Sequence, residues 1–86
     1  MSPLISSIVV DERKFFRALG ARIKGLRKGQ GYTQEDMISL GFSARHWQQI
    51  EAGRPITLRT LLKICDNFGI QAGQLIAGLD RGIYKK

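Results

Sequence analysis

Apolar residues recur every three to four positions over residues 11–28, and this spacing predicts an amphipathic helix with one apolar face. Asp11 and Glu12 stand at its start, where the helix dipole favours acidic side chains, and Arg27 and Lys28 stand at its end, where the dipole favours basic ones. Glycines at 29 and 31 then end the helix. The predicted apolar face consists of Phe15, Phe16, Leu19, Ile23 and Leu26.

Two short helices are predicted next, separated by a tight turn. Thr33 is placed to cap a helix that ends before Gly41. In the turn Gly41-Phe42-Ser43, the glycine can adopt a left-handed conformation, Phe42 can enter the core and Ser43 can cap the following helix. That helix covers residues 44–52 and is stopped by Gly53 and Pro55.

Two further helices complete the pattern. Thr57 is expected to cap the fourth, which Gly69 ends. A weaker fifth helix over residues 72–79 contains two glycines but presents three apolar side chains. The apolar face of the fourth helix is expected to consist of Leu58, Leu61, Leu62, Cys65 and Phe68.

The first ten residues differ from the rest, because they carry no charge and end in the β-prone triple Ile8-Val9-Val10. A boundary near Asp11 therefore divides the chain into an N-terminal arm, residues 1–10, and a globular domain, residues 11–86. The arm is a disordered end, an edge strand or a segment that packs on a partner. No strand alternation follows it, so the sequence predicts an all-α, five-helix domain with a short apolar N-terminal arm.

Composition and charge limit the classes of function that the chain can have. A chain of 86 residues forms one small domain at most, and its net charge of +7 favours a polyanionic partner, either nucleic acid or an anionic membrane surface. One cysteine and one histidine supply neither an internal disulfide nor a zinc site, so we expect no metal, no cofactor and a reducing cytoplasmic location. No stretch has the length of a membrane span or the pattern of a secretion signal.

The helix over residues 44–52 presents two different sides. At 100° per residue, Trp47 and Ile50 point one way, and we expect both in the core. The opposite side carries Arg45, Gln48 and Gln49. Arginine can donate two hydrogen bonds to guanine and glutamine can pair with adenine, so these are side chains suited to reading bases in a major groove. Two helices joined by a short turn form the geometry of a helix-turn-helix, whose second helix enters that groove.

Residues 19–79 resemble the Cro/C1-type helix-turn-helix family, also called the XRE family. The resemblance implies a five-helix, lambda-repressor-like DNA-binding domain that acts as a transcriptional regulator. The chain departs from the family pattern in its second helix, which is one residue shorter. The motifs that carry the resemblance are Gly31-Tyr32-Thr33-Gln34-Glu35, Gly41-Phe42-Ser43, Ile50-Glu51-Ala52-Gly53-Arg54 and Leu58-x-x-Leu61-Leu62 with Phe68-Gly69.

The resemblance also implies roles for individual residues. Gln34 is expected to bind a backbone phosphate, and Ser43 and Ala44 to approach the edge of the groove. Arg45 and Gln49 are expected to read bases, with Gln48 beside them. For His46, a phosphate contact and a half-buried packing role are equally open. The remaining implied phosphate or minor-groove contacts are those of Arg54 and Arg59.

Arg27 and Glu51 resemble a structural ion pair of that family, which joins the first helix to the end of the third. The alternative for Arg27 is one more base in a helix that carries seven Lys or Arg and two Asp or Glu. The pair is favoured because Glu51 has no compatible base three or four residues away on its own helix.

Together these features predict a sequence-specific regulator that binds double-stranded DNA. No catalytic arrangement of Ser, His, Asp or Cys and no phosphate-binding glycine loop is present, so we do not expect an enzyme. Two alternatives stay open. One is an antitoxin or adaptor of the same fold whose main partner is another protein, and the other is a membrane-surface module that uses the basic first helix.

A homodimer is also expected, because a single module of 9.6 kDa offers too few outward side chains to select one site in a genome. The uncharged arm provides one candidate interface. The preferred candidate is a C-terminal apolar ridge of Leu75, Ile76, Leu79, Ile83 and Tyr84.

Overall fold

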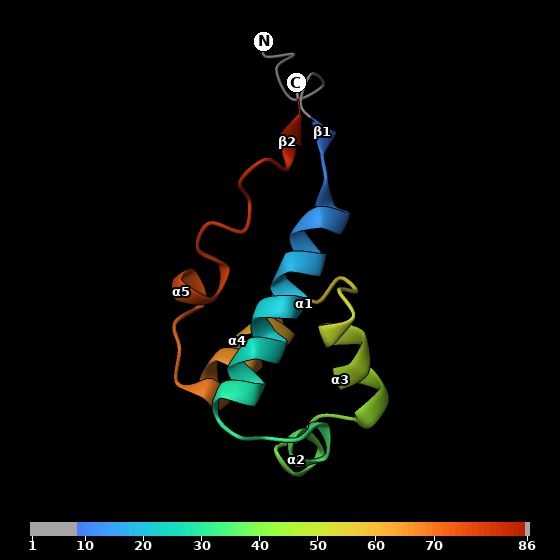
Figure 1. Ribbon diagram of the computed structural model, residues 1–86, viewed down its shortest axis with the longest axis vertical. Coiled ribbons are helices and arrows are strands. Elements are labelled where there is room, and N and C mark those ends of the chain that lie inside the picture. Colours follow the sequence, from blue (N-terminus) through green and yellow to red (C-terminus); the bar gives the residue numbers. More distant parts are fainter. Residues whose placement is uncertain (1–8, 86) are drawn as a thin grey trace.

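The computed structural model describes residues 9–85, which form five helices and two very short strands (Figure 1). The all-α architecture predicted from the sequence is confirmed, and four of the five helices lie within one residue of their predicted bounds. The elements in chain order are β1 (Val9–Val10), α1 (Glu12–Gly29), α2 (Gln34–Ser39), α3 (Ala44–Glu51), α4 (Leu58–Phe68), α5 (Ala72–Ile76) and β2 (Tyr84–Lys85).

Side-chain caps start the first four helices. Asp11, Thr33, Ser43 and Thr57 each accept a hydrogen bond from the backbone N–H three residues further on. Such caps satisfy amides that have no partner within the helix, and each stabilises its helix by about 1 kcal/mol. At Thr33 the cap is reciprocal, because the Asp36 carboxylate accepts from the Thr33 N–H at 2.7 Å. The three caps predicted from sequence, at 33, 43 and 57, are confirmed.

One core lies between α1, α3 and α4, and its centre is aromatic. Phe42 and Trp47 meet edge to face with their ring centroids 4.9 Å apart, and the ring centroid of Phe68 lies 6.4 Å from that of Trp47. The predicted core positions of Phe42 and Trp47 are therefore confirmed. The buried apolar side chains are Leu19, Ile23, Met37, Phe42, Trp47, Ile50, Leu61, Ile64, Cys65, Phe68, Leu75 and Ile83.

The apolar face of α4 was predicted in part wrongly. Leu58 and Leu62 are 76% and 60% exposed, whereas Ile64, absent from the predicted face, is fully buried. The buried positions 61, 64, 65 and 68 share one narrow side of the helix. Leu62 lies about 100° around the axis from Leu61 and points away from the core. Leu58 lies only about 20° around the axis from Cys65, but it is the first residue of α4 and borders an open apolar depression, so it stays exposed.

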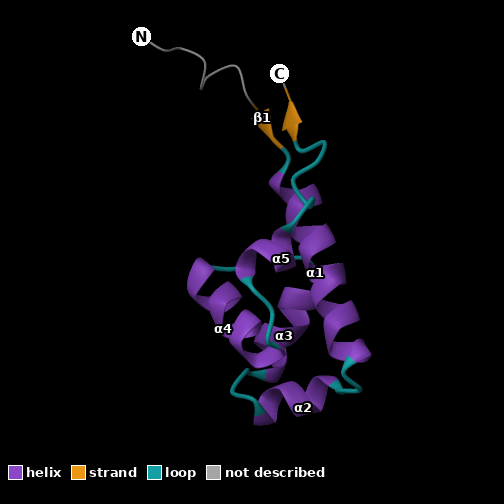
Figure 2. Cartoon of the chain, turned by 90° about the vertical axis from the view of Figure 1, so that its left-hand side faces the viewer, coloured by secondary structure: helices purple, strands orange, loops and turns teal. Residues whose placement is uncertain are grey.

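Close contact between α1 and α3 depends on Gly20. A Cβ placed on Gly20 would lie 2.6 Å from the carbonyl oxygen of Ile50 and 2.9 Å from that of Glu51. Both neighbours are backbone atoms, so only glycine permits this approach. The contact sets the position of the C-terminal end of α3 against α1, with α2 crossing below both helices (Figures 1 and 2).

The fifth helix is shorter than predicted. It ends at Ile76 rather than at residue 79, because Ala77 adopts ψ 125° and Gly78 follows with φ +76°. Carbonyl oxygens at the end of α5 accept hydrogen bonds from α1 instead of from a further helical turn. The guanidinium of Arg22 donates to the carbonyl oxygens of Leu75 at 3.0 Å and Ala77 at 2.7 Å. The end of α5 is therefore held by a side chain from the first helix.

The two ends of the described chain pair with each other. Val9 lies opposite Lys85 and Val10 opposite Tyr84 in an antiparallel ladder, and the Asp11 N–H donates to the Ile83 carbonyl at 2.7 Å. Figure 2 shows this ladder projecting from the helical body. Of the interpretations open for the arm, residues 9 and 10 form a strand, and β2 was not predicted. The other arm residues, 1–8, lie outside the described residues, as does Lys86.

Candidate nucleic-acid interface

The outer side of α3 presents polar side chains to solvent. Trp47 and Ile50 are 0% and 2% exposed and hold the inner side of the helix in the core. On the outer side, Arg45 and Gln48 are exposed and Gln49 is half-buried. The division of the helix predicted from its sequence is therefore present, with polar hydrogen-bonding groups free to meet a partner.

A four-residue turn sets α3 relative to α2. Leu40 ends α2, Gly41 adopts φ +102°, and Ser43 starts α3 by accepting a hydrogen bond from the His46 N–H at 3.0 Å. The ammonium group of Lys63, on α4, donates a hydrogen bond to the Gly41 carbonyl oxygen. Its nitrogen lies over the Phe42 ring, 4.5 Å from the ring centroid. The turn is thus held from inside by an aromatic side chain and from outside by a lysine.

Glu51, the last residue of α3, joins three helices. Its carboxylate accepts from Arg27 of α1 through Nε at 2.6 Å and Nη2 at 3.2 Å. It also accepts from the indole N–H of Trp47 at 2.6 Å and from the amide of Gln34, on α2, at 3.1 Å. The side chains of Arg27 and Glu51 are only 8% and 5% exposed, so the pair predicted from the sequence forms in a nearly water-free site.

These contacts keep the pair ionised. Burial opposes ionisation of Glu51, but the hydrogen bonds from Arg27, Gln34 and Trp47 outweigh it and lower the pKa of the carboxyl. The hydrogen bond to Glu51 raises the pKa of Arg27 above its already high ordinary value. A carboxylate with four donors is therefore a fixed point from which the end of α3 is oriented.

A comparison with family models decides what this pair of helices is. The model of the helix-turn-helix domain matches residues 18–77, which include α2, the turn and α3. The chain belongs to the helix-turn-helix domain family. This family is related to the Cro/C1-type XRE regulators, in agreement with the resemblance found in the sequence. No curated protein matches the chain.

Within the helix-turn-helix, three of the residues predicted to contact DNA come together. Gln34, Ala44 and Gln48 line one open depression of about 520 Å³ between α2 and α3. The amide nitrogen of Gln34 also donates to Glu51, so this side chain connects the structural network to the outer surface. Ser43 and Ala44 are exposed at the start of α3.

His46 is exposed, which excludes the half-buried packing role that the sequence left open. The two outlying arginines stand at the other end of α3. Arg54 lies in the loop after the helix and Arg59 is the second residue of α4, and both are exposed. Arg45 and Arg59 therefore stand on different elements, α3 and α4, joined by the loop that carries Arg54.

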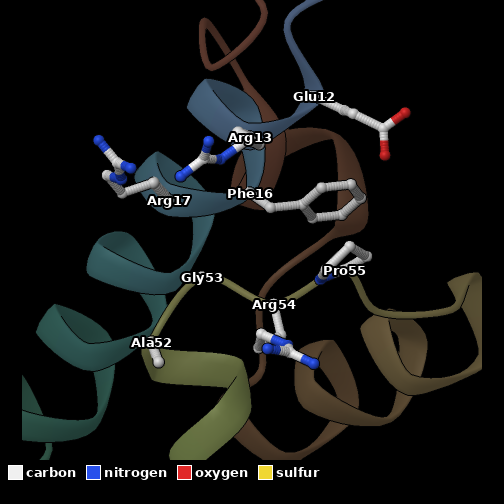
Figure 3. A pocket seen from close by; sticks show the side chains of 8 residues that line it. All are labelled: Glu12, Arg13, Phe16, Arg17, Ala52, Gly53, Arg54 and Pro55. Carbon is white, nitrogen blue, oxygen red and sulfur yellow. The ribbon is translucent and has the colours of Figure 1, made fainter.

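The loop after α3 is pressed onto the N-terminal half of α1. A Cβ on Gly53 would lie 2.9 Å from the Cα of Arg17, so only a glycine fits there. Beside this contact is a depression of about 360 Å³, and Figure 3 shows the side chains that line it: Glu12, Arg13, Phe16, Arg17, Ala52, Gly53, Arg54 and Pro55. From the sequence, Arg13 and Arg17 were interpreted only as part of a basic helix. Their proximity to the loop could not be predicted, because it arises from the packing of α1.

The predicted C-terminal ridge is only partly a surface. Leu75 is fully buried and Ile83 is 4% exposed, so these two side chains belong to the core of the monomer, and their assignment to an outer ridge was wrong. The physical reason is that the chain after α5 turns back along α1 to reach β1. Ile76 and Leu79 are half-buried, and Tyr84 is 57% exposed.

Within residues 9–85, no three His, Cys, Asp or Glu side chains lie close enough together to hold a metal ion. Cys65 is buried on α4, as predicted, and burial raises the pKa of its thiol, which keeps it protonated and unreactive. In the same range, every helix is too short or too polar to cross a membrane.

Proposed function

We propose that this protein is a transcriptional regulator that binds double-stranded DNA sequence-specifically, with α3 as the helix that enters the major groove. The observation that carries the proposal is the outer side of α3, where Arg45, Gln48 and Gln49 stand on a helix fixed by the Glu51 network. Membership of the helix-turn-helix family and the net charge of +7 support the same conclusion.

In this proposal, Arg45 and Gln49 read bases, with Gln48 next to them. Arginine at a guanine and glutamine at an adenine each form two hydrogen bonds, which discriminate by about 1–3 kcal/mol against the wrong base. The remaining residues position the protein on the DNA backbone: Gln34, Ser43, Ala44, His46, Arg54 and Arg59. These contacts raise affinity without selecting a sequence.

The proposal includes a symmetric homodimer on a pseudo-palindromic operator. Two-fold symmetry requires half-sites about 34 Å apart, one helical turn of DNA. Of the ridge predicted from the sequence, Tyr84 and the half-buried Ile76 and Leu79 are available for the interface. Val10 is 47% exposed and pairs with Tyr84, so it extends the apolar surface at the paired strands.

The test is selection of bound sites from random duplex DNA, first with the unmodified protein. Arg45→Ala is then expected to cost about 1–3 kcal/mol at the selected site and to relax the preference at one base pair. Arg81→Ala is the matched control, because Arg81 is exposed and lies in the turn after α5. It removes the same charge and should leave the preferred sequence unchanged. If Arg45→Ala selects the same sequence as the unmodified protein, α3 is not the reading helix.

A further inference from the structure

Three arginines from two elements line the depression beside Gly53. Arg13 and Arg17 come from α1, and Arg54 comes from the loop after α3. All three side chains are exposed, and within residues 9–85 none of them has an acidic partner or a hydrogen bond from its side chain. We call this depression, defined by Arg13, Arg17 and Arg54, the arginine pocket.

The orientation of α1 directs two of these arginines toward the α3 side. Gly20 touches the end of α3, and at 100° per residue Arg13 and Arg17 lie within about 60° of Gly20 around the axis of α1. Figure 3 shows both arginines extending from one side of α1, while Glu12 and Phe16 extend to the other. The Glu12 carboxylate therefore points away from the guanidinium groups of Arg13 and Arg17, and Asp11 borders an adjoining depression that these two arginines also line.

The position of the loop at the arginine pocket is fixed by backbone contacts rather than by flexible side chains. Gly53 sits against the Cα of Arg17, so the loop that carries Arg54 cannot separate from α1 without loss of this packing. Pro55 restricts the same loop through its fixed φ. Arg13 and Arg17 lie one helical turn apart on the same side of α1, so their like charges repel each other, and an anion bound beside them offsets that repulsion.

We infer that the arginine pocket binds the phosphate backbone of duplex DNA and extends the contact surface beyond α3. The inference rests on the proposed function and adds Arg13 and Arg17 to it. In a helix-turn-helix, the N-terminal residues of the second helix contact the base edges. The C-terminal end of α3, about 12 Å further along, and the loop after it therefore lie toward the phosphates at the edge of the groove. Arg54 stands at that edge, and the backbone that continues past it meets Arg17 and Arg13.

Arginine suits this role because its planar fork donates to two phosphate oxygens at once. Each phosphate contact releases counterions from the DNA. The plot of log K against log salt therefore becomes steeper by about 0.9 for each phosphate contacted. Removal of two contacts is then expected to flatten the plot of log K against log salt by about 1.8 per protomer.

The experiment measures binding of the full chain to a mixed-sequence duplex of about three helical turns, by fluorescence anisotropy at several salt concentrations. The variant Arg13→Gln/Arg17→Gln is expected to bind more weakly at low salt. Between about 50 and 200 mM salt, the ratio of its Kd to that of the unmodified protein should shrink at least about tenfold. The variant Arg13→Lys/Arg17→Lys retains both charges and should keep the original slope.

The matched control is Lys14→Gln/Arg81→Gln. It removes the same charge, but Lys14 lies against Gly82 and neither side chain lines the arginine pocket. Equal effects of the two glutamine double variants would mean that only total charge matters, and would overturn the inference. Because Arg13 and Arg17 are exposed, thermal unfolding of their variant should match that of the control.

The two proposals fail differently. If the unmodified protein binds no duplex, the proposed function fails and this inference fails with it. If the unmodified protein binds but Arg13→Gln/Arg17→Gln binds equally well with the same slope, only the inference fails. A loss of binding to phosphatidylserine vesicles with unchanged duplex binding would assign the pocket to a membrane surface and overturn the inference.

Discussion

At the scale of single residues, the hydrogen bonds of Glu51 fix the direction in which the polar outer side of α3 points. Its carboxylate collects two hydrogen bonds from Arg27, one from Trp47 and one from Gln34. Breaking a buried ion pair by removal of one partner leaves a charge without compensation, which costs more than the pair itself contributes. A change at Glu51 therefore acts on three helices at once and on all DNA sequences equally.

We predict that Glu51→Gln lowers the free energy of unfolding at about pH 7 by about 3 kcal/mol, because Arg27 loses its counter-charge. The folded pKa of Glu51 is lowered from its ordinary value of 4.5, so the carboxylate stabilises the fold above that value and this contribution is lost as the pH falls through the lowered pKa. The difference between variant and unmodified protein should therefore shrink toward about pH 3. Urea unfolding at both pH values measures it.

Gln34→Ala is the control for this prediction. It removes only one neutral donor to Glu51, so its effect on stability should be smaller, about 1 kcal/mol, and nearly the same at both pH values. If the difference in unfolding free energy between Glu51→Gln and the unmodified protein does not change with pH, the Glu51 carboxylate is not ionised in the folded protein and the prediction is wrong.

At the scale of secondary-structure elements, the decisive contact is the crossing of α1 over the end of α3. The carbonyl oxygens of Ile50 and Glu51 lie where a side chain on residue 20 would have to be. Because these are backbone atoms, the two helices must separate to admit even a methyl group. Such a separation would also shift Glu51 relative to Arg27 and would change the angle at which α3 is presented.

Gly20→Ala is predicted to lower the free energy of unfolding by about 1–3 kcal/mol, from overpacking, and to weaken DNA binding. The matched control is Gly25→Ala in the same helix, where an added Cβ has no atom within 4 Å. That variant should be more stable by up to about 1 kcal/mol, because alanine is the better helix former. Thermal unfolding of the two variants compares them directly, and equal shifts in the same direction would contradict the close-approach argument.

At the scale of the whole molecule, the proposed homodimer requires an exposed surface that meets a second copy of the chain. Two exposed apolar areas are candidates. One contains Tyr84, at the paired termini, and the other contains Leu58 and Leu62, on the outer side of α4. We favour the first, because the two-stranded ladder projects from the helical body and an isolated pair of short strands is stabilised by further packing.

We predict that Tyr84→Arg shifts the monomer–dimer equilibrium toward the monomer, because it places a charge in a buried apolar interface. Leu62→Arg is the matched control: it adds the same group at a site of similar exposure, 60% against 57%, and should leave the equilibrium unchanged. Light scattering over a range of protein concentrations, alone and with the selected duplex, makes the comparison. A protein that is monomeric in both states on an asymmetric site would contradict the dimer.

Much of the fold is predictable from local sequence. Caps at Thr33, Ser43 and Thr57 depend on one hydroxyl and an amide three residues away, so the residue types alone indicate them. The inner side of α3 follows from the spacing of Trp47 and Ile50. On α4 the same reasoning failed at Leu58 and Leu62, because an apolar residue at the edge of a helix face is buried only when a neighbouring element covers it.

The sequence by itself determined the first four helices, three of their caps, the polar outer side of α3 and the basic charge, because each of these depends on residue types or on residues close together in the chain. Only the tertiary structure decided what depends on residues far apart: the junction of Gln34 and Trp47 at Glu51, the burial of Leu75 and Ile83, the pairing of β1 with β2 and the meeting of Arg13 and Arg17 with Arg54. These arrangements follow from how the helices pack, above all from the two glycines, Gly20 and Gly53, that let backbones touch. Spacing along one helix carries no information about which other segment will cover it, so such contacts cannot be predicted from local pattern alone.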